Sequence, residues 1–172
     1  MPADAVPSWE AAVEAARALH AALGPGRSIG CAESCTGGLA AAAITALPGS
    51  SAWFERGLVT YSNRAKIELL GVDAAVLRRC GAVSEEVARA MAENLLRAAP
   101  VDATLAITGI AGPDGGSAGK PVGLVWFGWA WRAAGTVHTA TQHQIWRGDR
   151  EAVRLASTRH ALLGLAQRLP RG

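Results

Sequence analysis

A chain of 172 residues, half of them hydrophobic, is long enough to bury one substantial core and too apolar to be disordered. The net charge is only +3 and the basic residues are scattered, so nucleic-acid binding has little support. No apolar run approaches the roughly 20 residues that cross a bilayer, and the first 25 residues lack the features of a secretory signal. We therefore expect one domain over residues 1–172, with its core at about 8–168, in the cytoplasm and away from membranes.

Cysteine and histidine do not form a pattern that binds metal. Cys31 and Cys35 are separated by three residues, which matches neither the redox C-x-x-C motif nor a zinc knuckle, and Cys80 stands alone. The four histidines show no ligand spacing on a common element. We therefore expect no disulfide framework, no metal and no cofactor.

The first half of the chain alternates between helical and strand patterns. Apolar residues recur at helical spacing from Trp9 to Leu23, between a capping serine and a terminating glycine. The predicted elements are a helix over 9–23, a strand over 28–32, a helix over 37–47, a turn over 49–57, a strand over 58–61, and helices that follow the capping residues Ser62, Asp73 and Ser84.

The second half adds strands, a long loop and a last helix. A β-rich run over 103–108 leads into "GIAGPDGGSAGKPVG", which holds six glycines and two prolines in 15 residues. Two apolar arms over 122–132 and 136–146 are predicted to form a hairpin turned at 133–135, and a closing helix starts at Asp149. Strands that alternate with helices, together with a hairpin, predict an α/β fold with a mixed sheet.

The stretch "CAESCTGG" places reactive side chains where a strand turns into a helix. Ser34 falls at the carboxyl edge of the predicted sheet, where open α/β sheets bind ligands. The next helical turn offers unpaired N–H groups, and Gly37 and Gly38 let a ligand approach that backbone. A hydroxyl beside such donors can act as a nucleophile with an oxyanion hole at 36–38, although an ordinary N-cap gives the same pattern. Cys35 is a rival nucleophile, or a small buried packing residue.

The stretch "TYSNRAK" adds a candidate base. With Ser62 as the N-cap, Tyr61 and Lys66 occupy the N′ and N4 positions, whose side chains meet in a staple arrangement. The helix dipole and partial burial both lower the pKa of a lysine there, so that a neutral Lys66 can act as a general base. An exposed lysine with Tyr61 packed on its stem would have the same spacing.

The glycine-rich loop and the last helix offer sites for an anion. The loop lacks the P-loop spacing, because proline follows Lys120, and it lacks the Rossmann fingerprint. Thr108, Gly109 and Gly112 expose backbone amides to a phosphate or carboxamide, unless the loop is a solvated turn. Arg150 lies in the first turn of the last helix, where a cation gains nothing from the dipole, which indicates either anion binding or a surface ion pair.

Several long motifs together resemble the CinA C-terminal family, through residues 8 to 168. They are "AESCTGG", "GSSAWFERGLVTYSNRAK", "LLGV", "GAVSEEV", "TGIAGPDGGSAGKPVGLVWF" and "GDREAVR". The chain most resembles the stand-alone members of this family, the nicotinamide-nucleotide amidohydrolases. The resemblance implies a compact three-layer α/β/α sandwich whose mixed sheet includes a C-terminal hairpin, and a homodimer or larger assembly.

The resemblance also implies a reaction and the residues that perform it. The reaction is hydrolysis of the carboxamide of nicotinamide mononucleotide, in pyridine-nucleotide salvage, without a metal. Ser34 would be the nucleophile and Lys66 the base, assisted by Tyr61. The predicted substrate contacts are Glu33, Thr36, Gly37, Gly38, Thr108, Gly109, Gly112 and Arg150.

Other functions remain open at this point. A non-catalytic module of the same family would bind a pyridine nucleotide or a partner protein without releasing ammonia. An amidohydrolase with the same mechanism would act on another small carboxamide. An accessory protein of DNA uptake or repair would need a basic surface stripe, which the sequence lacks.

Overall fold

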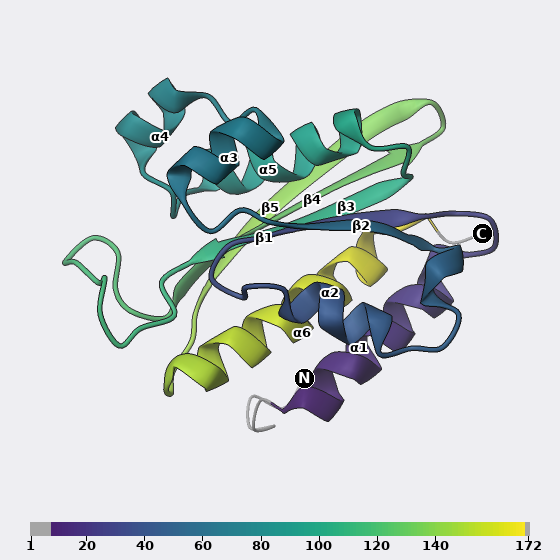
Figure 1. The fold of residues 1–172 in the computed structure, drawn as a ribbon, viewed down its shortest axis with the longest axis horizontal. Coiled ribbons are helices and arrows are strands. Elements are labelled where there is room, and N and C mark those ends of the chain that lie inside the picture. The colour runs from purple at the N-terminus through teal and green to yellow at the C-terminus, as the bar shows by residue number, and fades with distance from the viewer. Residues whose placement is uncertain (1–7, 171–172) are drawn as a thin grey trace.

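The computed structural model describes residues 8–170, which contain a five-stranded mixed sheet with helices on both faces (Figure 1). The strands are β1 (Ile29–Glu33), β2 (Phe54–Val59), β3 (Ala103–Gly109), β4 (Leu124–Ala133) and β5 (Thr136–Ile145). Their order across the sheet is β2-β1-β3-β4-β5. β1 runs parallel to both of its neighbours, whereas β4 pairs antiparallel with β3 and with β5. The predicted mixed sheet with its hairpin is confirmed.

Six α-helices of the described residues form the two outer layers. They are α1 (Trp9–Leu23), α2 (Leu39–Thr45), α3 (Asn63–Leu70), α4 (Ala74–Cys80), α5 (Glu85–Ala98) and α6 (Arg150–Arg168). α1, α2 and α6 lie on one face of the sheet, and α3, α4 and α5 lie on the other (Figure 1). This arrangement is the three-layer sandwich that the motifs imply. No helix within residues 8–170 is long and apolar enough to cross a membrane.

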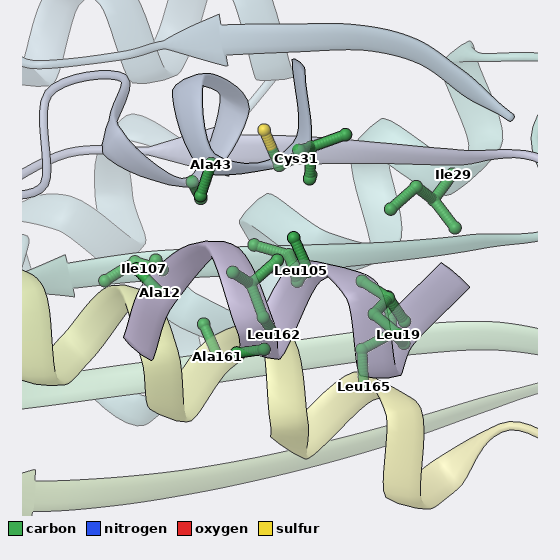
Figure 2. Close-up of a cluster of buried hydrophobic side chains, with 14 of the residues drawn as sticks. Ala12, Leu19, Ile29, Cys31, Ala43, Leu105, Ile107, Ala161, Leu162 and Leu165 are labelled. Atoms are coloured by element: carbon green, nitrogen blue, oxygen red, sulfur yellow. The ribbon is translucent and has the colours of Figure 1, made fainter. Parts of the chain in front are cut away.

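Each face of the sheet has its own apolar core. Figure 2 shows the core beneath α1 and α6, where Leu19, Leu162 and Leu165 approach Leu105 of β3 and Ile29 of β1. All five side chains are fully buried. A second core joins α5 to the opposite face. Because burial of apolar surface drives folding, these two cores hold the strand ends in fixed positions.

Side-chain caps define where most helices begin. The Oγ atoms of Ser8, Ser62 and Ser84 accept hydrogen bonds from backbone N–H groups three residues later. Carboxylate oxygens cap α4 and α6 in the same way: Asp149 accepts from the N–H three residues later, and Asp73 from the N–H two residues later. Such caps satisfy N–H groups that have no partner within the helix. The predicted starts of these five helices are confirmed.

α2 starts two residues later than predicted. Gly37 and Gly38 have φ angles of 61° and 101°, so they lie outside the right-handed helical region and form a turn before Leu39. Glycine adopts such angles without the steric cost that a Cβ brings. The two glycines therefore separate Ser34 from the helix that follows it.

β2 also differs from its prediction, because it spans 54–59 rather than 58–61. A short 3₁₀ helix, η1 (Ser50–Ala52), precedes it in place of part of the expected turn. Pairing with β1 ends where Val59 lies opposite Glu33, and the Thr60 N–H then donates to the Glu33 carbonyl at 2.7 Å. Residues 60–62 thus leave the sheet at its carboxyl edge, beside the end of β1.

Candidate active site

Ser34 follows the last residue of β1 and lies at the carboxyl edge of the sheet, as predicted. Its N–H donates to the Ile107 carbonyl of β3 at 2.9 Å, and the residue is 8% exposed. Its Oγ accepts a hydrogen bond from Lys66 Nζ at 3.0 Å. Segments 32 residues apart thus bring a hydroxyl and an amine into contact.

Lys66 is held beside Ser34 by the first turns of α3. Ser62 caps this helix, and Lys66 is its fourth residue. The side chain is buried, with 1% of the residue exposed, and Nζ also donates to the Thr60 carbonyl at 2.7 Å. Burial lowers the pKa of Lys66 to about 8, because the charged form loses its hydration. Within residues 8–170 no carboxylate forms an ion pair with it.

These two side chains line a cavity of about 270 Å³. The cavity lies between the ends of β1 and β3, the segment before α5 and the start of α6. Its lining residues are Ser34, Cys35, Tyr61, Lys66, Ala82, Val83, Thr108, Gly109, Ile110, Ala111, Gly112, Asp114, Gly115 and Arg150. Six of the predicted site residues therefore share this cavity with the Ser34–Lys66 pair: Tyr61, Thr108, Gly109, Gly112 and Arg150 as neighbours, and Cys35 as the rival nucleophile.

Tyr61 lies at the exposed mouth of the cavity that Lys66 also lines. It is 59% exposed, and its hydroxyl oxygen accepts a hydrogen bond from Arg150 Nη2 at 2.8 Å. Arg150 Nη1 donates to the Gly112 carbonyl at 2.8 Å. Among the described residues no hydrogen bond joins Tyr61 to Lys66; the hydroxyl of Tyr61 instead joins the segment after β2 to α6 and the loop.

The beginning of the glycine-rich loop forms one wall. Thr108 is buried and its Oγ1 donates to the Ala82 carbonyl at 2.8 Å. At Gly109 an added Cβ would lie 2.6 Å from a methyl group of Val125 and 2.8 Å from the Leu124 carbonyl. Only glycine fits there, so this wall is shaped by close contact between the end of β3 and β4.

Glu33 and the two glycines after it do not line the cavity. The fully buried Glu33 carboxylate accepts hydrogen bonds from the N–H groups of Gly38, Ala40 and Ala41 at 2.9–3.1 Å. It thus stabilises the start of α2, because these N–H groups have no partner within the helix. The structure gives Glu33 this helix-capping contact in place of the predicted substrate contact.

The available oxyanion donors differ from the predicted set at 36–38. The Gly37 N–H donates to the Ser34 carbonyl at 3.0 Å, and the Gly38 N–H donates to Glu33. Within residues 8–170 neither the Cys35 N–H nor the Thr36 N–H donates a hydrogen bond to another residue. These two N–H groups directly follow Ser34 and are the free donors nearest to it in sequence.

Cys35 is a poor rival for Ser34. Its thiol is buried, and burial raises the pKa of the Cys35 thiol to about 12. The thiolate, which is the reactive form, is therefore strongly disfavoured. No cluster of three or more His, Cys, Asp or Glu side chains within residues 8–170 is arranged to hold a metal ion.

Sequence reasoning missed several residues of the site. Asp114 lines the cavity, and Ala82 and Val83 form its wall beside Thr108. Arg154 reaches the turn after Ser34 from α6 and donates to the Thr36 carbonyl at 2.8 Å. Arg154 had a detectable signal, because it follows Arg150 by one helical turn and must lie on the same side of α6.

Comparison with known proteins relates this site to one family. The CinA C-terminal domain family matches residues 12–169. Proteins named nicotinamide-nucleotide amidohydrolase PncC are 58% identical in Enterobacter agglomerans, over 85% of each chain, and 51% identical in Escherichia coli strain K12, over 83% of this chain and 84% of that one. The crystal structure of competence/damage inducible protein CihA from Agrobacterium tumefaciens has a TM-score of 0.84 and 41% identity, and covers 95% of this chain and 98% of its own. The chain belongs to the CinA C-terminal domain family.

Proposed function

We propose that this chain is an amidohydrolase that converts nicotinamide mononucleotide and water to nicotinate mononucleotide and ammonia. The observation that carries the proposal is the 3.0 Å contact between Lys66 Nζ and Ser34 Oγ in the wall of a cavity. A serine activated by an adjacent base is a nucleophile suited to acyl transfer. Relatives named nicotinamide-nucleotide amidohydrolase, at 58% and 51% identity, support the choice of substrate.

The first half of the proposed reaction transfers the acyl group to Ser34. Neutral Lys66 accepts the hydroxyl proton while Oγ attacks the carboxamide carbon, and the N–H groups of Cys35 and Thr36 bind the oxyanion. The protonated Lys66 then gives its proton to the amide nitrogen. The C–N bond breaks, ammonia leaves, and an ester joins the nicotinoyl group to Ser34.

The second half returns the enzyme to its starting state. A water molecule loses a proton to Lys66 and attacks the ester carbon, and the same N–H groups bind the second oxyanion. When the ester bond breaks, the proton returns from Lys66 to Ser34 Oγ. Nicotinate mononucleotide leaves as the carboxylate.

Arg150 and the adjoining loop are the proposed contacts of the substrate phosphate. The Arg150 guanidinium lies at the cavity mouth, and the loop residues Gly112 and Gly115 have positive φ angles that turn their backbone toward the cavity wall. Guanidinium groups bind phosphate oxygens through paired hydrogen bonds. Because Tyr61 accepts its hydrogen bond from Arg150, its own hydroxyl hydrogen is free to contact the bound nucleotide.

The test of the mechanism is ammonia release from nicotinamide mononucleotide by the wild type and by Ser34→Ala. The variant should lose turnover by on the order of 10³-fold or more, since no other nucleophile replaces Oγ, while calorimetry shows retained nucleotide binding. Ser50→Ala, in η1 away from the cavity, is the matched control and should keep full activity. Near-normal ammonia release by Ser34→Ala would refute the assignment.

The same assay tests the proposed substrate independently of the proposed mechanism. A panel of nicotinamide, nicotinamide riboside and nicotinamide mononucleotide should show the highest kcat/KM for the mononucleotide. Faster release from another carboxamide would keep the Ser34–Lys66 chemistry and overturn the proposed substrate. Tight binding of the mononucleotide without any ammonia would overturn the proposed activity.

A further inference from the structure

A residue of α6 contacts the turn that follows Ser34. Arg154, one helical turn after Arg150, extends across the layer and donates from Nη2 to the Thr36 carbonyl at 2.8 Å. The two residues are 118 positions apart in sequence. Arg154 does not line the cavity, so it can act on the reaction only through the groups that it holds.

The contact connects to the free N–H of Cys35 through two peptide groups. The Thr36 carbonyl and the Gly37 N–H belong to one planar peptide group. Arg154 donates a hydrogen bond to the oxygen of this peptide group, and the Gly37 N–H of the same group donates to the Ser34 carbonyl at 3.0 Å. The Ser34 carbonyl in turn shares a planar peptide group with the Cys35 N–H. Arg154 therefore helps to fix the direction in which the Cys35 N–H points.

The guanidinium also adds positive charge behind this turn. Within residues 8–170 Arg154 takes part in no ion pair, so no carboxylate neutralises it directly. Burial raises the pKa of the Cys35 thiol, and the charge of Arg154 acts weakly in the opposite direction, as expected for a cation near this turn. The same charge stabilises negative charge that develops on a substrate oxygen there.

We propose that Arg154 is a positioning residue that orients and polarises the oxyanion-binding N–H groups of Cys35 and Thr36. The proposal rests on the proposed function for its role in turnover, since an oxyanion hole matters only if Ser34 acylates. This role differs from a purely structural one, because the hydrogen bonds from Arg154 lead to an N–H group that is proposed to bind the oxyanion. Arg154 itself does not contact the substrate.

The test uses Arg154→Met, which keeps the unbranched stem of the side chain and removes its charge and donors. With nicotinamide mononucleotide we expect kcat to fall about 10- to 100-fold, less than the 10²–10³ typical of removing an oxyanion donor itself, and KM to stay within about threefold. Arg154→Lys should recover part of kcat, and added methylguanidinium should rescue Arg154→Ala. Arg159→Met, on the same helix but outside the cavity lining, is the matched control and should behave as the wild type.

A second readout is independent of the substrate. A fluorophosphonate probe that labels Ser34, followed by intact mass, should react more slowly with Arg154→Met by a similar factor. Labelling of the wild type without ammonia release would overturn the proposed function and leave the role of Arg154 standing. Labelling of Arg154→Met at the wild-type rate, an equal kcat, or a loss that methylguanidinium and Arg154→Lys both fail to restore would overturn the proposal.

Discussion

Lys66 places its amino group where water hardly reaches, and this sets the pH range in which it can accept a proton. Burial lowers the pKa of Lys66 to about 8. In the proposed reaction the base must be neutral, so kcat/KM should rise with pH through about 8 and level off above it, one proton being lost per active site. The measurement is ammonia release between about pH 6 and about pH 10. A rate that falls across this range would contradict a neutral Lys66.

Lys66→Arg keeps the positive charge but supplies no neutral base, since guanidinium groups stay protonated. We expect kcat to fall by about 10²- to 10⁴-fold, the usual contribution of general base catalysis. Lys120 is the only other lysine of the chain and lies outside the cavity lining, so Lys120→Arg is the matched control. An active Lys66→Arg enzyme would remove lysine from the mechanism.

Arg150 bridges Tyr61 and the Gly112 carbonyl at the mouth of the cavity. If it also binds phosphate, Arg150→Met should raise KM for nicotinamide mononucleotide about 10- to 100-fold, as expected for a lost charge-assisted hydrogen bond. Nicotinamide riboside has no phosphate and should show little change. An equal rise in KM for both substrates would indicate that Arg150 stabilises the positions of Tyr61 and the loop and does not bind the phosphate.

At the scale of elements, Glu33 joins β1 to α2 by accepting three backbone N–H groups. Glu33→Gln replaces one acceptor oxygen by an NH₂ group. This group cannot accept a hydrogen bond, so at least one of the backbone N–H groups loses its partner. We expect the free energy of unfolding to fall by about 1–3 kcal/mol, the cost of an unsatisfied buried group. Urea denaturation measures this change.

Glu68→Gln is the control for that substitution, because Glu68 pairs with Arg64 on the exposed side of α3. Exposed ion pairs contribute only about 0–1 kcal/mol, so its unfolding free energy should stay close to that of the wild type. If Glu33→Gln were equally mild, the buried carboxylate would not be what holds the start of α2.

Helix starts were predictable from sequence because a cap and its partner lie within four residues. Ser62 and Asp73 needed no knowledge of the rest of the fold. The bounds of β2 were not predictable in this way, since they depend on where Val59 meets Glu33 in another strand. The partners of Glu33 are nearer in sequence, at residues 38–41, but whether they reach its carboxylate depends on the turn formed by Gly37 and Gly38.

The same distinction between local and long-range features applies to the candidate site. Ser34 and Lys66 were identified because each follows a strand and lies near a helix start, two local features that place them on one edge of the sheet. Arg154 and Asp114 lie within the quoted motifs "GDREAVR" and "TGIAGPDGGSAGKPVGLVWF", but neither directly follows a strand and precedes a helix start, and their proximity to the site comes from how α6 and the loop pack. The hydrogen bond between Tyr61 and Arg150, 89 residues away, also depends on how α6 packs and has no local sequence signal.

At the scale of the whole molecule, His160 makes stability depend on pH. Its ring packs against Phe127, with centroids 4.6 Å apart, and against Trp129 and Trp146, and burial lowers the pKa of His160 from 6.5 to about 4. Between these values the unfolded chain binds a proton that the folded chain does not. Stability contributed by this residue is therefore complete above about pH 6.5 and declines as the pH falls toward about 4, by at most about 1.4 kcal/mol per pH unit.

The measurement is the unfolding midpoint in urea as the pH is lowered over that interval. His160→Leu should flatten the slope, since the leucine binds no proton. The exposed His138, which stacks on Trp131 at the outer sheet edge, provides the control His138→Leu, and this variant should keep the wild-type slope. If the slope is unchanged in His160→Leu, other titratable groups cause the dependence of stability on pH.

The reactive pair and most of the cavity wall come from different parts of the chain. Ser34 and Lys66 follow β1 and β2, whose parallel pairing fixes their separation, whereas residues 108–115 extend from β3. Exchange of the glycine-rich segment between relatives would thus alter the wall of the cavity, while the contact between Ser34 and Lys66 stays in place. In such a fold the shape of the cavity can diversify by loop replacement without a change in the two side chains that the proposed reaction uses.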